Sequence, residues 1–162
     1  MSSNSIGNSG AKQIATALAT NKSVTVVDFS HNEISDDGAV ALADMLITNE
    51  NLTTVKLVSN SIGDSSAKRV VTVLATNNII ITLDLLHNEI GNIGALALAD
   101  MFLANKTLTE LNLFGNKGSD EYDSMLTARS DPQMWAISYE QLVHVRDLAM
   151  ELSREKEINL VD

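Results

Sequence analysis

The sequence predicts an α/β solenoid built from stacked copies of one strand–helix unit. Three observations carry this prediction. An asparagine recurs every 28 residues, apolar residues keep a fixed register before it, and the residues after it have helical spacing. The recurring asparagines are Asn4, Asn32, Asn60, Asn88 and Asn116. Five copies in register make this periodicity specific for a repeat fold.

A short buried strand is predicted before each asparagine. The positions three, five and eight residues upstream are apolar in every complete unit. They are Phe29, Val27 and Val24, then Leu57, Val55 and Leu52, then Leu85, Leu83 and Ile80, and last Leu113, Leu111 and Leu108. Polar residues between these positions are typical of a strand that buries one face. An isoleucine follows two residues after the asparagine at Ile6, Ile34, Ile62 and Ile90, whereas the fifth unit has Gly118.

The second half of each unit predicts a helix, because apolar residues recur there at steps of three and four. The columns are Ala11, Ala39, Ala67 and Ala95, then Ile14, Leu42, Val70 and Leu98, then Leu18, Leu46, Leu74 and Phe102. One unit cannot bury its apolar face alone, but stacked units share a continuous core. We expect the amide of each turn asparagine to bond backbone groups that would otherwise be buried unpaired, so that successive turns form a ladder.

Over about residues 4–116, this pattern resembles the ribonuclease-inhibitor type of leucine-rich repeat. The resemblance implies a horseshoe with parallel strands on the concave face and helices on the convex face. Alternate units share short identical sequences, such as His-Asn-Glu-Ile in units two and four, which indicates duplication of a two-unit pair. The repeats are also similar to those of leucine-rich effectors of intracellular bacteria and, less closely, to actin-capping tropomodulin repeats. Such likeness specifies a fold and leaves function open.

The ends of the chain give two further expectations. We divide the chain into a solenoid of four to five units, residues 1–128, and a C-terminal helical cap, residues 129–162. In the cap, Ser138 and Gln141 form a capping-box pattern. An apolar stripe follows at Leu142, Val145, Leu148, Ala149 and Leu152, and a partner-binding helix is the alternative interpretation. Unit one lacks its strand, so Ile6, Ile14 and Leu18 would lie on an open flank. Either the chain is a piece of a longer protein, or a second copy covers the flank in a homodimer.

Composition narrows the classes of partner and chemistry. The net charge of −10 repels phosphate, which disfavours nucleic acid and anionic membranes. No stretch approaches the ~18 apolar residues of a membrane span. The absence of cysteine removes disulfides, thiolate zinc sites and cysteine nucleophiles, and fits a reducing compartment. We find no phosphate loop and no nucleophile elbow, so we expect neither enzyme activity nor a cofactor. The expected location is the cytoplasm, or a host cell's cytosol if the chain is an effector.

The candidate partner-binding residues lie on the predicted strands, where alternate side chains point away from the core. One outward column holds Asp28, Lys56, Asp84 and Asn112, and another holds Ser30, Val58, Leu86 and Phe114. We interpret Asp28, Lys56, Val58, Asp84, Leu86, Asn112 and Phe114 as a protein-binding surface on the concave face. Two blander interpretations stay open: a solvated charged face, and a C-terminal segment that folds over Phe114.

Three other functions are alternatives to protein binding. His31 and His87 lie two units apart, about 10 Å for strands ~4.8 Å apart, which is too far to share a metal ion. Regulation of a small GTPase, as in Ran-activating proteins with this repeat type, would usually need a cation aimed at the nucleotide. The predicted concave face offers Lys56, whereas Arg69 falls on a helix. A self-associating structural module is the third possibility.

Overall fold

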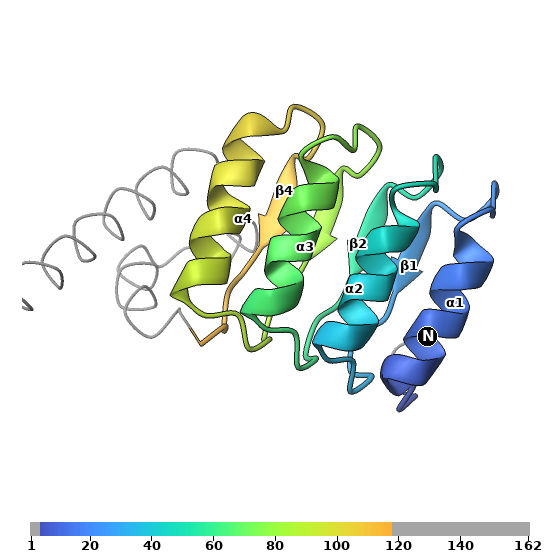
Figure 1. Cartoon of the computed structure of the whole chain (residues 1–162), viewed down its shortest axis with the longest axis horizontal. Helices are drawn as coiled ribbons and strands as arrows, with labels where there is room; N and C mark the ends of the chain where they lie inside the picture. Colours follow the sequence, from blue (N-terminus) through green and yellow to red (C-terminus); the bar gives the residue numbers. More distant parts are fainter. Residues whose placement is uncertain (1–3, 118–162) are drawn as a thin grey trace, which may run out of the picture.

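The computed structural model describes residues 4–117, in which helices and strands alternate along the chain (Figure 1). The elements are α1 (Gly7–Leu18), β1 (Val26–Asp28), α2 (Asp36–Met45), β2 (Thr54–Lys56), α3 (Asp64–Leu74), β3 (Thr82–Asp84), α4 (Asn92–Ala104) and β4 (Glu110–Asn112). Each helix therefore precedes the strand of the following unit, as the spacing predicts. The expected C-terminal cap, residues 129–162, lies outside the described residues.

The four strands form one parallel sheet in chain order, β1-β2-β3-β4. Residues 28 apart lie side by side in it, as Val27 pairs with Val55, Val55 with Leu83, and Leu83 with Leu111. The helices lie next to one another along one face of the sheet (Figure 1). This arrangement confirms the predicted α/β solenoid.

The core lies between the sheet and the helices, and it is mainly aliphatic. Ile34, Ile62 and Ile90 are fully buried directly after the turns. The alanine column brings the helices close together, because Ala11 and Ala67 have no exposed surface. One sequence expectation is wrong here. Leu18 is buried rather than displayed on the N-terminal flank, since it packs into the same core cluster.

The expected ladder of turn asparagines is present. Asn60 Oδ1 accepts hydrogen bonds from the backbone N–H groups of Asn32 and Ile34, at 3.2 and 2.9 Å. Its Nδ2 donates to the backbone carbonyls of Phe29 and Leu57. Asn32, Asn88 and Asn116 repeat this pattern one unit earlier or later. One buried side chain thus joins two neighbouring turns and satisfies the backbone of both.

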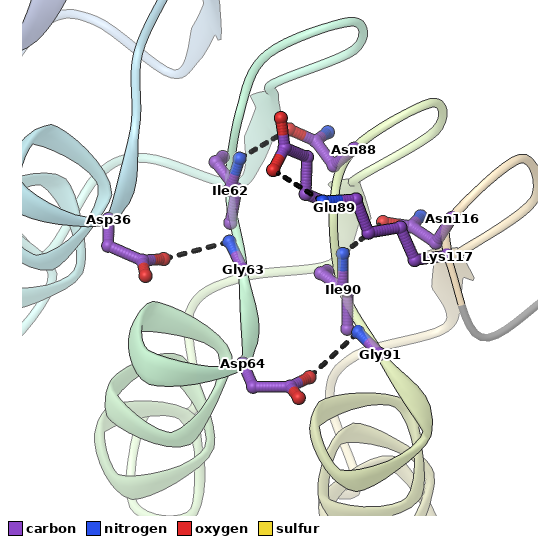
Figure 2. A network of polar contacts seen from close by, with 10 residues as sticks. All are labelled: Asp36, Ile62, Gly63, Asp64, Asn88, Glu89, Ile90, Gly91, Asn116 and Lys117. Carbon is purple, nitrogen blue, oxygen red and sulfur yellow. Dashed lines mark hydrogen bonds and ion pairs between the residues drawn. The ribbon is translucent and has the colours of Figure 1, made fainter.

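A second ladder joins the helix starts, and the sequence analysis did not foresee it. The N-cap residues of α2, α3 and α4 make no capping bond with their own side chains. Instead, Asp36 Oδ1 accepts from the N–H group of Gly63 in the next unit, and Asp64 Oδ1 accepts from that of Gly91 (Figure 2). The same two oxygens also accept from the N–H groups of Ser66 and Gly94. Asn8 serves the start of α2 in the same way. Each helix start is therefore capped by the unit before it.

The helix ends carry a third ladder, also of asparagines. The Nδ2 groups of Asn49, Asn77 and Asn105 donate to the carbonyls of Leu18, Leu46 and Leu74, the residues at or next to the end of the preceding helix. Their Oδ1 atoms accept backbone N–H groups in their own loops. Orphan carbonyls at a helix end are thereby satisfied by the following unit.

The turn before each ladder asparagine adopts a left-handed conformation. His31, Ser59 and His87 have φ angles of 58°, 52° and 52°. In the fourth copy Gly115 takes this place, with φ 70°. A Cβ at Gly115 would overlap the imidazole ring of His87. The ring of His87 in the preceding unit therefore explains why the fourth copy has glycine at position 115.

Candidate protein-binding face

The concave face is the sheet face that points away from the helices. In every strand the middle residue is buried and its two neighbours are partly or fully open to solvent. Strand register places the outward residues in straight columns across the sheet. Because the strands are fixed by ladders at both rims, these side chains are presented on a rigid surface.

The charged column is assembled as the sequence predicts. Asp28 lies beside Lys56, Lys56 beside Asp84, and Asp84 beside Asn112. Lys56 is exposed and forms no ion pair with a described residue, although carboxylates stand on both sides of it. Its ammonium group is therefore available to a partner.

The two aspartates of this column have different electrostatic environments. A hydrogen bond from the Ser30 side chain is the main cause that lowers the pKa of Asp28, and the Ser30 N–H group and Lys56 act in the same direction. Partial burial is the main cause that raises the pKa of Asp84. The Leu86 N–H group and Lys56 offset part of that effect, while Asp28 adds repulsion. The charge of Asp84 is thus the less well compensated of the two.

The apolar column is less exposed than the sequence pattern predicts. Ser30 is buried, Val58 and Leu86 are half-buried, and Phe114 is 38% exposed. The ring of Phe114 meets His87 edge-on, with 6.0 Å between ring centroids. The apolar contact surface is therefore centred on Phe114, with Leu86 beside it.

Two exposed apolar residues were missed by the sequence analysis as candidates. Val26, in β1, is 55% exposed at the start of its strand. Ile81, directly before β3, is 44% exposed and stands in a column otherwise held by Thr25, Thr53 and Thr109. The change from threonine to isoleucine in this column could have identified Ile81 as an exposed apolar residue from the sequence. Strand alternation places Val26 on the outward face as well, but it is not among the candidate residues.

Residues 4–117 contain neither a metal-binding cluster nor a helix that could span a membrane. This part of the chain holds no group of three or more histidine, cysteine or acidic residues placed to bind a metal ion. His31 and His87 are both exposed and lie two units apart. None of its helices is long and apolar enough to cross a membrane.

Comparison with known proteins agrees with this architecture. Four segments, residues 20–43, 48–71, 76–99 and 104–117, match a family model described as "Leucine Rich repeat", and together they cover more than half of the chain. Their starts are 28 residues apart, which is the period of the structure. No curated protein sequence matches the chain.

Among solved structures, 49 chains match, so the fold is widely shared and does not itself name a function. One of them is described as "Leiomodin-1 Actin-Binding Site 2 (ABS2)". It superposes with a TM-score of 0.62 at 19% sequence identity, over 94% of this chain and 79% of that chain. This identity shows a common fold alone. From the family match and the 28-residue architecture, the chain belongs to the leucine-rich repeat family.

Proposed function

We propose that this chain binds another protein through its concave face. The observation that carries the proposal is the open column of Asp28, Lys56 and Asp84, held in register and without an ion pair for Lys56 among the described residues. Charges fixed in a row on a rigid surface favour one partner over others. Leucine-rich repeats generally serve as binding modules and use such concave surfaces.

The size of the surface supports a macromolecular partner. Four strands at ~4.8 Å spacing spread the columns over about 14 Å across the sheet. Phe114 at one side and Val26 at the other add exposed apolar contacts to the charged centre. Aromatic residues such as Phe114 are enriched in protein interfaces.

Actin is the first defined partner to test, because the leiomodin fragment with this fold is described as an actin-binding site. The chain would be mixed with monomeric and with filamentous actin, and binding followed by fluorescence and by co-sedimentation. If actin does not bind, affinity capture from a cell lysate supplies other candidate partners. Either partner is then used in the test of the face itself.

The test compares two double variants with the same change of charge and polarity. Lys56→Glu with Leu86→Glu alters the concave face. Lys68→Glu with Ile93→Glu alters exposed positions on α3 and α4, on the helix layer. We expect the first pair to weaken binding at least about tenfold, as when a charged contact and an apolar contact are lost together. Equal binding by both double variants would refute the concave face as the site.

Regulation of a GTPase is the alternative function, with weaker support. Lys56 is the cation on the described concave strands, and Arg69 is engaged with Asp44 on the helix layer. Its test is nucleotide hydrolysis by a panel of small GTPases with and without the chain. Acceleration that is lost with Lys56→Glu would favour this function over simple binding. Delivery into a host cytosol, implied by the effector resemblance, stays a prediction.

A further inference from the structure

The outward charges of the sheet alternate in sign across three neighbouring strands. In the charged column, Asp28 of β1 pairs in register with Lys56 of β2, which pairs with Asp84 of β3. Neutral Asn112 of β4 completes the column. Parallel strands lie ~4.8 Å apart, so these residues follow one another at steps of ~4.8 Å, and the outer two charges are ~9.6 Å apart. The face thus presents a negative, a positive and a negative group in a row perpendicular to the strands.

No ion pair within residues 4–117 neutralises this row. Lys56 has no carboxylate within ion-pair distance there, and the hydrogen bonds that Asp28 and Asp84 accept come from neutral groups. The remaining charge on the four strands is Glu110, whose carboxylate accepts from the Thr82 hydroxyl. Three carboxylates against one ammonium group leave these strands with an excess of negative charge. A complementary partner therefore carries a positive, a negative and a positive group, with a positive excess.

The spacing of the charged column matches one side of an α-helix. On a helix, residues i, i+4 and i+7 lie on one side, at ~6.0 and ~10.5 Å along the axis, since each residue rises ~1.5 Å. With i+3 in place of i+4, the middle residue lies at ~4.5 Å. A β-strand returns to one side every ~6.7 Å, and a polyproline helix every ~9.3 Å. Of these three conformations, the α-helix alone places one side chain opposite each of the three strands.

An apolar surface lies along one side of the charged column. Val58, Leu86 and Phe114 are two residues further along the chain than the column, ~6.7 Å away, and Phe114 is 38% exposed. On the other side of the column, β2 and β3 carry Thr54 and Thr82. A helix over these two strands would meet apolar groups on one flank and hydroxyl groups on the other. An amphipathic helix with apolar residues next to a charged stripe fits this arrangement.

We infer that the partner of the concave face is an amphipathic α-helix that lies across the strands, with a cation, an anion and a cation opposite Asp28, Lys56 and Asp84. This inference rests on the proposed function and adds the chemistry of the partner. An arginine faces Asp84, because a guanidinium group is more weakly hydrated than an ammonium group and loses less beside a half-buried carboxylate. The apolar stripe of the same helix packs on Leu86 and Phe114.

Two synthetic helical peptides of identical composition test the inference on the full chain. Each is held helical by the same side-chain staple and has a leucine stripe. The first carries arginine, glutamate and arginine at i, i+4 and i+7, and in the second the glutamate and the last arginine change places. Fluorescence anisotropy at low salt measures their binding. We expect the first peptide to bind at least about tenfold more tightly, because the exchange sets like charges opposite Lys56 and Asp84.

Charge reversal on the protein gives a matched test. With Lys56→Glu the column is negative throughout, so each peptide meets one like charge and the preference for the first peptide should disappear. A peptide with three arginines should bind this variant at least about tenfold more tightly than it binds the parent chain. Lys68→Glu, the same substitution at an exposed position on α3, should keep the preference. Circular dichroism shows whether each variant is folded.

The inference is overturned if the parent chain binds both peptides equally, or binds neither with a Kd below about 1 mM. It is also overturned if folded Lys56→Glu keeps the preference. The proposed function has its own outcome. If Lys56→Glu with Leu86→Glu abolishes binding of a captured partner while the peptides are not distinguished, the concave face is the site but its partner is not this helix. If that double variant leaves partner binding intact, the proposed function itself fails.

Discussion

The turn ladder and the helix-start ladder join the same units but use different chemistry. At the turns, buried amides both accept and donate, as Asn60 does toward two N–H groups and several carbonyls. At the helix starts, the carboxylates of Asp36 and Asp64 only accept, from the N–H groups of Gly63 and Gly91 (Figure 2) and, at Asp36, also from the Ser66 hydroxyl. The difference follows the backbone: turns present both kinds of group, whereas a helix start presents donors alone.

This comparison predicts different responses to pH. An amide does not ionise, so the turn ladder is indifferent to acid. Partial burial disfavours ionisation of Asp36, but hydrogen bonds from Ser66 and Gly63 outweigh it and lower the pKa of Asp36 below its ordinary value. The Asp36 contact is therefore the point of the helix-start ladder that acid can loosen.

The largest effect is expected from Asn60→Asp, which turns a turn amide into a carboxylate. The carbonyls of Phe29 and Leu57 would lose their donor, and a negative charge would be buried beside them. We expect a loss of at least about 3 kcal/mol in the free energy of unfolding at pH 7, measured by urea denaturation.

Burial among carbonyls would raise the pKa of the new carboxyl group, so its penalty applies above that pKa and disappears as pH falls toward the unfolded value. The loss should therefore shrink at pH 4. Asn78→Asp, on an exposed loop, is the matched control and should change stability little. A similar loss for both variants would contradict the role given to the turn ladder.

A smaller effect is expected from Asp36→Ala, which removes the cap of the α3 helix start. The loss should be about 1–2 kcal/mol in urea denaturation at pH 7, the usual range for an N-cap. Asp36→Asn should retain much of the stability that Asp36→Ala loses, because Asn8 caps α2 in the same way with an amide oxygen. Equal losses from both substitutions would mean that charge, rather than the acceptor atom, holds the units together.

The acid limb of the stability curve sharpens the same comparison. The contribution of the Asp36 charge is present above the unfolded pKa, near the ordinary value of 3.8, and is lost as pH falls through the lower folded pKa. Asp36→Asn should therefore flatten the fall in stability below about pH 4. Asp84 has the opposite sign: its raised pKa means that Asp84→Asn should stabilise slightly at pH 7, by less than about 1 kcal/mol, and not at acid pH.

The smallest effect is expected at the exposed pair of Lys117 and Glu89, which bridges two turns at 2.9 Å (Figure 2). Lys117→Ala should cost below about 0.5 kcal/mol, because water screens both groups. Added salt should erase even that difference. A larger, salt-resistant loss would show that this pair is part of the ladder rather than a solvated contact.

The turn ladder could be predicted from the sequence because asparagine recurs at positions 32, 60 and 88. The sequence concealed the helix-start ladder, although Asn8, Asp36, Asp64 and Asn92 also keep a step of 28 residues. Asparagine and aspartate both occur at that position, and the backbone N–H groups that they cap belong to the following unit. The N-cap positions of single helices, such as Gly63 and Gly91, therefore carry no capping side chain.

The charged part of the candidate site was likewise readable, because Asp28, Lys56 and Asp84 follow from strand alternation alone. The exposure of Val58 and Leu86 was not. Both side chains are half-buried, although alternation places them in an outward column. Local patterns thus placed residues in columns, whereas the exposed fraction of each side chain depends on its packing in three dimensions.

The ladders also constrain how the length of this chain can change in evolution. The side-chain bonds between units join residues 25 to 31 positions apart, so each bond reaches the adjacent unit and no further. Insertion or loss of 28 residues would leave every remaining bond with an equivalent partner. A change whose length is not a multiple of 28 residues would displace asparagine, carboxylate and helix start together. Growth by whole units, one or two at a time, is therefore the change that this architecture tolerates.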